Sequence, residues 1–208
     1  MCIGLQERAT GARPVGGLTI LIAKAVRMQD LPRILILAAG KGSRFNASGG
    51  SGNKLDALLE GKTLLEHTLT AVRASGLPWH IETGPHPGMS DSIAAAVGAT
   101  RDAPGWLILP ADLPLIQADT LRQIAFAQPV NSIATPVWQG KRGHPVRFPI
   151  EYRDRLVNLS GAQGAASLLT QASVTEVQVE DRGCQLDVDT LEDLQQLLEI
   201  RLKQLPPT

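Results

Sequence analysis

The feature that most constrains this chain is a short apolar run that passes directly into a glycine-rich loop. Ile34–Ala39 contains only aliphatic side chains, and Gly-Lys-Gly-Ser-Arg-Phe follows at 40–45. Two glycines within three residues let the backbone N–H groups after a buried strand turn toward an anion. Arg44 and Lys54 would supply the positive charge that phosphate oxygens need. The segment predicts a phosphate-binding loop, although a glycine-rich turn without a ligand has the same pattern.

The composition of the chain limits the number of domains and the classes of binding partner. At 208 residues with 43% apolar side chains, the chain is expected to form one domain over 31–204. Residues 1–30 are expected to be either a disordered extension or a segment that precedes the true start of the protein. Twenty basic and twenty acidic side chains cancel, which argues against nucleic-acid or membrane-surface binding. Cys2 and Cys184 form no Cys-x-x-Cys pair, and we find neither a convincing signal peptide nor an apolar run long enough to span a membrane. A cytoplasmic location is expected.

Apolar runs alternate with helical patterns along the rest of the chain. A Thr63-x-x-Glu66 capping box predicts a helix that ends at Gly76, and Gly, Ser and Asn at 46–53 predict a mobile loop. Further strands are expected at 79–83, 106–109, 132–138, 143–148, 175–179 and 185–188. Further helices are expected around Ile93, where Ser90 or Ser92 would be the cap, at 119–127, at 164–171 and after Thr190. The alternation predicts an α/β three-layer sandwich with a twisted, predominantly parallel, mixed sheet that binds ligands at its carboxyl edge.

Acidic residues occur at two places where this edge is expected. Asp112 follows the apolar strand 106–109 and lies between Pro110 and Pro114. A carboxylate at this position is better suited to binding Mg²⁺ than to packing in the core. Asp187 and Asp189 alternate along an expected strand and would point to the same face. Asp112 and Asp189 are the candidate magnesium ligands. The alternative for Asp112 is that it only stabilises a local turn. The alternative for Asp187 and Asp189 is that they only cap the helix that follows, and one of these two aspartates is expected to be structural.

Five segments in order resemble those of nucleotidyltransferases with a nucleotide-diphospho-sugar-transferase-like fold. They read Leu-Ala-Ala-Gly-Lys-Gly-Ser-Arg-Phe at 37–45 with Lys54, Gly-Met-Ser-Asp-Ser at 88–92, Leu-Pro-Ala-Asp-Leu-Pro at 109–114, Arg-Gly-His-Pro-Val at 142–146 and Asp-Val-Asp-Thr with Asp193 at 187–193. The match is closest to the MobA/MocA-type branch, and within it to molybdenum cofactor cytidylyltransferases. The resemblance spans roughly 33–198.

The resemblance implies roles for individual residues. It implies catalytic roles for Arg44, Lys54 and Asp112, and it implies that Asp112 and Asp189 hold Mg²⁺ as the cofactor. The nucleotide-binding residues that it implies are Leu37, Ala38, Ala39, Gly40, Gly42, Ser43, Lys54 and Ser92, and the acceptor-binding residues are Arg142, Gly143 and His144. For His144, a purely structural turn beside Pro145 is an equal alternative.

The resemblance also implies a reaction: a phosphate-bearing acceptor, with molybdopterin favoured, takes CMP from CTP and pyrophosphate leaves. Ala39 favours CTP, because guanylyl-transferring relatives tend to have glycine there. A molybdoenzyme or its chaperone is a further partner that the resemblance implies. Two departures weaken the acceptor assignment: Gly161–Ala166 lacks the acidic and basic members of a Gly-Asp-x-Gly-Ala-Arg segment, and 77–87 has room for only one short strand.

Three other functions remain open at this stage. A nucleotidyltransferase that acts on a sugar phosphate, a polyol phosphate or another nucleotide would share nearly all these residues. A degenerate member could bind nucleotide as a regulatory module. A dehydrogenase is least favoured, because Phe45 stands where the dinucleotide fingerprint needs a third glycine.

Overall fold

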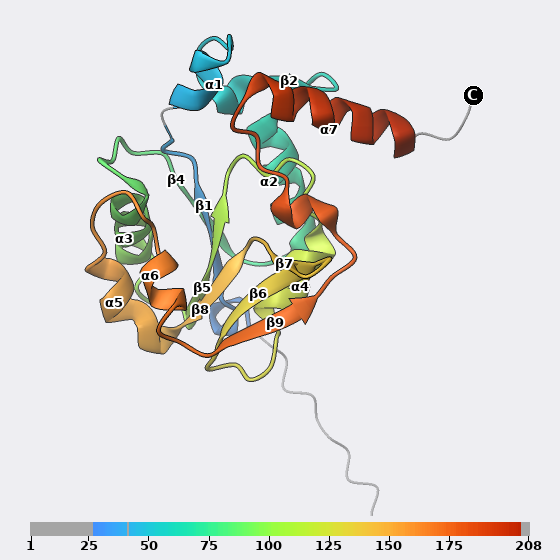
Figure 1. Cartoon of the computed structure of the whole chain (residues 1–208). Coiled ribbons are helices and arrows are strands. Elements are labelled where there is room, and N and C mark those ends of the chain that lie inside the picture. The colour runs from blue at the N-terminus through green and yellow to red at the C-terminus, as the bar shows by residue number, and fades with distance from the viewer. Residues whose placement is uncertain (1–26, 41, 205–208) are drawn as a thin grey trace, which may run out of the picture.

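A seven-stranded mixed sheet forms the centre of the molecule (Figure 1). The computed structural model describes residues 27–40 and 42–204, so most of the expected extension at 1–30 lies outside the described residues. The strands lie in the order β4 (Trp79–Glu82), β1 (Arg33–Leu37), β5 (Gly105–Pro110), β8 (Val146–Pro149) and β6 (Ile133–Trp138), and both β7 (Lys141–Arg142) and β9 (Val174–Gln178) pair with β6. β4, β1, β5, β6 and β9 run in one direction, whereas β8 and β7 run against it.

Helices cover both faces of this sheet, which confirms the predicted three-layer α/β sandwich. One face packs against α2 (Leu64–Ser75) and α4 (Ala118–Ala125), and the other against α3 (Met89–Ala99), α5 (Arg153–Val157) and α6 (Ala166–Leu169). Successive side chains of a strand point to opposite faces. Accordingly, Ile34 and Ile36 enter the first core, whereas Leu35 and Leu37 enter the second.

A third apolar cluster lies beyond the carboxyl ends of the central strands. It joins α1 (Ser43–Ala47), the hairpin of β2 (Leu58–Leu59) and β3 (Lys62–Thr63), and α7 (Leu191–Gln204), which lie together at the top of Figure 1. Phe45, Leu59, Leu64, Val188 and Leu197 are its buried members. The edge of the sheet where ligands are expected therefore lies beneath this cluster.

Most predicted elements are present within one or two residues of their expected bounds. Thr63 and Glu66 form the predicted capping box, and a single strand, β4, occupies the short segment before α3. Thr190 Oγ1 accepts the N–H of Asp193 at the start of α7. No helix in the described part of the chain is long and apolar enough to cross a membrane.

Three local expectations are wrong. The segment 185–188 forms no strand, and a 3-10 helix, Arg182–Gln185, leads into it. Neither Ser90 nor Ser92 caps α3, since their hydroxyls donate to the carbonyl oxygens of Gly164 and Gly88 instead. The expected loop at 46–53 loses its first two residues to α1, because Phe45 packs into the third cluster and continues the helix across them.

The guanidinium of Arg147 lies inside the first core, where the strand pattern alone suggests an apolar residue. Arg147 is 3% exposed and belongs to β8. Its two terminal nitrogens donate to the backbone oxygens of Ile124, Ala125, Ala127, Pro129 and Ser132. The last turn of a helix leaves carbonyl groups without partners. Arg147 satisfies those of α4 and holds the following loop against the sheet.

Replacing Arg147 with leucine should therefore lower the free energy of unfolding by about 3 kcal/mol or more, because several buried carbonyl groups lose their donor. Urea denaturation of Arg147→Leu measures the loss. Arg101→Leu, at an exposed position, is the control and should change stability little. Equal stability of the two variants would contradict this account of the buried guanidinium.

Candidate active site

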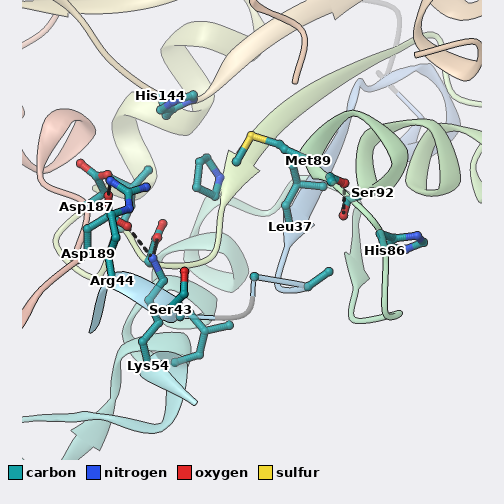
Figure 2. Close-up of a pocket in the computed structure, with 18 of the residues that line it drawn as sticks. Leu37, Ser43, Arg44, Lys54, His86, Met89, Ser92, His144, Asp187 and Asp189 are labelled. Atoms are coloured by element: carbon teal, nitrogen blue, oxygen red, sulfur yellow. Dashed lines mark hydrogen bonds and ion pairs between the residues drawn. The ribbon is translucent and has the colours of Figure 1, made fainter. Parts of the chain in front are cut away.

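A cavity of about 590 Å³ opens at the carboxyl edge of the sheet. Its walls come from the ends of β1 and β5, the starts of α1 and α3, and the segments 142–144 and 184–189 (Figure 2). Among the residues singled out from the sequence, those that line it are Leu37, Ala39, Gly40, Gly42, Ser43, Arg44, Lys54, Ser92, Asp112, Arg142, Gly143, His144 and Asp189. Ala38 does not line the cavity, because its side chain packs against the first core. One cavity thus gathers residues that lie up to 152 positions apart in the sequence, from Leu37 to Asp189.

The glycine-rich loop brings its own backbone close to Lys54. Gly42 has a φ of +59°, which L side chains rarely adopt, and precedes the first turn of α1. A Cβ atom added to Gly42 would lie 3.4 Å from the Cβ atom of Lys54. The two glycines thus leave backbone open to the cavity while the stem of Lys54 passes beside it.

The ammonium group of Lys54 lies between two carboxylates. Its Nζ atom is 2.5 Å from Oδ2 of Asp112 and 2.9 Å from Oδ1 of Asp189. Nη1 of Arg44 lies 2.6 Å from the other carboxylate oxygen of Asp189. The side chain of Lys54 is 11% exposed, whereas that of Arg44 is 76% exposed. Two cations and two anions therefore form one network, buried at Lys54 and open to solvent at Arg44.

Burial and neighbouring charges set the protonation states in this network. Burial lowers the pKa of Lys54, but its contacts with Asp112 and Asp189 outweigh burial and leave the pKa above its ordinary value. Lys54 is therefore charged at neutral pH. Burial, together with the nearby charges of Asp112 and Asp189, raises the pKa of Asp187, which also lines the cavity.

The carboxylates of the cavity have the chemistry of a divalent-cation site. Oδ1 of Asp112 is buried and has no hydrogen-bond partner among the described residues. A buried carboxylate oxygen without a partner is costly, and a hard cation such as Mg²⁺ would satisfy it. In the described part of the chain, no group of three or more histidine, cysteine or acidic residues is arranged to hold a metal by itself. Mg²⁺ is commonly held by one or two carboxylates plus substrate phosphates, so Asp112 and Asp189 fit it.

Backbone contacts fix the positions of the two aspartates. The N–H of Val188 donates to the carbonyl oxygen of Asp112 at 3.1 Å, which ties the 187–189 segment to the loop after β5. Val188 is fully buried in the third cluster, whereas Asp187 and Asp189 both line the cavity. The alternation expected of a strand is present here without a strand.

Asp193 holds the backbone on the other side of Asp189. Its Oδ2 atom accepts the N–H groups of Asp189 and Thr190 and the Thr190 hydroxyl. Burial acts to raise the pKa of Asp193, but these bonds outweigh it and hold the pKa below its ordinary value of 3.8. The ionised carboxylate thus stabilises both the start of α7 and the loop that carries Asp189.

The opposite wall carries the residues singled out for the acceptor. The N–H of His144 donates to the carbonyl oxygen of Cys184 at 2.7 Å, and Gly143 packs so tightly on Cys184 that a side chain at 143 would collide with it. Burial lowers the pKa of His144 despite the nearby charges of Asp112 and Asp187, and its buried Nδ1 atom has no partner among the described residues. Arg142 is half exposed and pairs with Glu176 at 2.8 Å.

The far end of the cavity contains two residues to which the sequence analysis gave no role. His86 and Met89 line it beside Ser92 (Figure 2). Nε2 of His86 is 3.0 Å from Oε1 of Glu82, whose other oxygen lies 3.5 Å from Nε2 of His80. In the sequence, His86 lies just before the Gly-Met-x-x-Ser segment, and Met89 is part of it. Asp187 was noted in the sequence without a role in the site, and Gln185 was not singled out.

Asp193→Ala should lower the free energy of unfolding by about 1 kcal/mol at neutral pH, because the start of α7 loses its acceptor. The native-state pKa of this group is depressed, so its contribution is present above the ordinary value of 3.8 and disappears as the pH falls through the lower native value. Urea denaturation of wild type and variant over this range measures the difference. Asp193→Asn, which keeps the shape without the charge, is the control; a pH-independent difference would contradict the role of the charge.

Comparison with known proteins supplies a family context for this cavity. A family model for the MobA-like NTP transferase domain matches residues 34–78 and 71–177. No curated protein matches the chain at a significant level.

Several solved structures share the fold. Rv0371c from Mycobacterium tuberculosis H37Rv, solved in complex with manganese, is 23% identical with a TM-score of 0.65 over 81% of this chain and 98% of its own. A nucleotidyl transferase from Methanothermobacter thermautotrophicus is 17% identical with a TM-score of 0.72 over 85% and 100%. Molybdopterin-guanine dinucleotide biosynthesis protein A from Archaeoglobus fulgidus is 19% identical with a TM-score of 0.60 over 83% and 100%.

Proposed function

We propose that this chain, which belongs to the MobA-like NTP transferase family, transfers CMP from CTP to a phosphate-bearing acceptor, with molybdopterin favoured, and releases pyrophosphate. Family membership makes it a nucleotidyltransferase; the base and the acceptor are the proposed parts. The observation that carries the proposal is the convergence of the glycine-rich loop, Lys54, Asp112 and Asp189 on one cavity. A triphosphate that enters this cavity can contact all of them.

In the proposed reaction, an acceptor phosphate oxygen attacks the α-phosphorus of CTP. The new phosphorus–oxygen bond forms as the bond from the α-phosphorus to the oxygen of the β-phosphate breaks, and the electron pair leaves with pyrophosphate. A phosphate nucleophile is already ionised at neutral pH, so no general base is required. The barrier is then mainly one of position and electrostatics.

The loop and its two cations would bind the leaving group. Backbone N–H groups around Gly40 and Gly42 would donate to phosphate oxygens, and Arg44 and Lys54 would neutralise the charge that develops on pyrophosphate. The guanidinium of Arg44 is exposed and, in the part of the chain that the structure describes, its ion pair is with Asp189 alone, so it can move toward a bound substrate.

Asp112 and Asp189 are the residues that would hold Mg²⁺, and their carboxylate oxygens fit its preference for hard ligands. The ion, when bound, supplies positive charge that stabilises the transferring phosphoryl group. Manganese in the structure of the mycobacterial relative supports the choice of a divalent cation.

CTP is proposed over GTP on the strength of Ala39, which lines the cavity beside Leu37. Arg142, Gly143 and His144 are proposed to face the acceptor, because they line the wall opposite the phosphate loop.

Lys54→Ala and Asp112→Ala should each lower kcat by about 100-fold or more, because each removes charge that stabilises the transition state. Pyrophosphate release with CTP and candidate acceptors measures the effect, and circular dichroism checks folding. Lys62→Ala and Asp102→Ala, at exposed positions outside the cavity, are the matched controls. Full activity in folded Asp112→Ala would remove Asp112 from the proposed site, and no pyrophosphate release with any acceptor would favour a regulatory nucleotide-binding module.

Parallel calorimetric titrations with CTP, GTP and ATP test the base. CTP should bind about tenfold or more tightly than the other two in the presence of Mg²⁺, because a site that hydrogen-bonds one base leaves polar groups unpaired with another. Tighter binding of GTP would replace the cytidylyl assignment with a guanylyl one. Sugar-phosphate and polyol-phosphate acceptors in the turnover assay separate the possible acceptors.

A further inference from the structure

The four carboxylate oxygens of Asp112 and Asp189 are unequally occupied. Lys54 takes one oxygen from each residue, and Arg44 takes the second oxygen of Asp189. Among the described residues, nothing pairs with the fourth oxygen, Oδ1 of Asp112. Two positive side chains therefore match two negative ones, and the acid pair is already neutralised by the protein itself.

A divalent cation cannot bridge the two carboxylate oxygens that hold Lys54 without displacing its ammonium group. Mg²⁺ binds oxygen at about 2.0–2.1 Å, so an ion that bridged Oδ2 of Asp112 and Oδ1 of Asp189 would take the position of the ammonium group. Moving a buried ammonium group away from both acids leaves its charge without a partner, which is costly. In the free protein, cation and lysine compete for the same oxygens.

A triphosphate changes that competition. The stem of Lys54 lies beside the glycine-rich loop, where the Cβ position of Gly42 is 3.4 Å from Lys54 Cβ and 3.5 Å from Lys54 Cγ. The flexible stem of lysine lets the ammonium group turn from the acids toward phosphates bound by that loop. The nucleotide thus offers Lys54 new anionic partners and frees the two carboxylates in the same step.

We propose that Lys54 is an internal counter-ion that keeps the Asp112–Asp189 pair closed to divalent cations until a nucleotide triphosphate draws it away. This inference rests on the proposed function, because it takes the two aspartates as the metal ligands. Its consequence is a binding order in which the cation enters with the nucleotide or after it. The free protein then has little affinity for the ion by itself.

Manganese binding in the absence of nucleotide tests the proposal, with electron paramagnetic resonance of Mn²⁺ as the readout. If Lys54 leaves the acids in one molecule in ten or fewer, the apparent dissociation constant of the wild type is raised about tenfold or more. Lys54→Met removes the competing charge, so it should bind Mn²⁺ about tenfold or more tightly than wild type. Lys62→Met, an exposed lysine on β3, is the matched control and should bind like wild type.

Two further variants test whether the charge of Lys54 causes the effect and whether the ion binds at Asp112. Lys54→Gln keeps a hydrogen-bond donor near the acids without the charge and should change Mn²⁺ affinity in the same direction, which covers the case in which Lys54→Met does not fold. Adding Asp112→Asn to Lys54→Met should abolish the gained binding. A gain that survives Asp112→Asn would place the ion elsewhere and contradict the proposal.

Failure of this inference differs from failure of the proposed function. If wild type binds Mn²⁺ only together with CTP but folded Lys54→Met and Lys54→Gln bind Mn²⁺ alone no more tightly than wild type, Lys54 is not the counter-ion and the metal site stands. If no variant binds Mn²⁺ with or without CTP, the assignment of Asp112 and Asp189 as metal ligands falls, and the counter-ion proposal falls with it.

Discussion

The contact of one buried ammonium group with two carboxylates is the interaction on which the cavity depends. Lys54 meets Asp112 across 58 residues of sequence and Asp189 across 135. Charges as buried as these are costly when they are unpaired, so their contacts favour the fold in which the three segments that carry them reach the same place. The cavity is thus built into the folded state.

The topology of the sheet explains why these segments meet. β1 and β5 are parallel neighbours, so the glycine-rich loop and the loop of Asp112 leave the sheet at the same edge. The 187–189 segment joins them through the bond from Val188 to Asp112, and the third apolar cluster anchors Val188. Apolar packing therefore places the segment that carries Asp189 beside the segments that carry Lys54 and Asp112.

The sequence predicts those parts of the fold that local patterns determine. The alternation of strands and helices, the Thr63–Glu66 capping box and the position of the glycine-rich loop and Asp112 at one edge of the sheet follow from hydrophobic periodicity, local capping patterns and the carboxyl-edge rule. The choice of Asp189 came from the alternation of Asp187 and Asp189, which both line the cavity although the strand expected at 185–188 is absent.

Features that depend on contacts between residues far apart in the sequence were not predicted. The carbonyl groups that Arg147 satisfies lie 15 to 23 residues away, and no periodic pattern marks them. The bonds of Ser90 reflect how the 161–164 backbone packs on α3, whereas the hydroxyl of Ser92 bonds back to the carbonyl oxygen of Gly88, four residues earlier. The pairing of His86 with Glu82 likewise appears only once β4 is placed at the edge of the sheet.

The central claim is that one nucleotide triphosphate contacts the glycine-rich loop, Lys54 and the two aspartates together. A crystal structure of the protein with Mn²⁺ and a CTP analogue that cannot release pyrophosphate tests it most directly, because anomalous scattering locates the metal. The account predicts manganese between Asp112 and Asp189, and Lys54 on the phosphates. A nucleotide bound outside this cavity, or manganese remote from both aspartates, would contradict it.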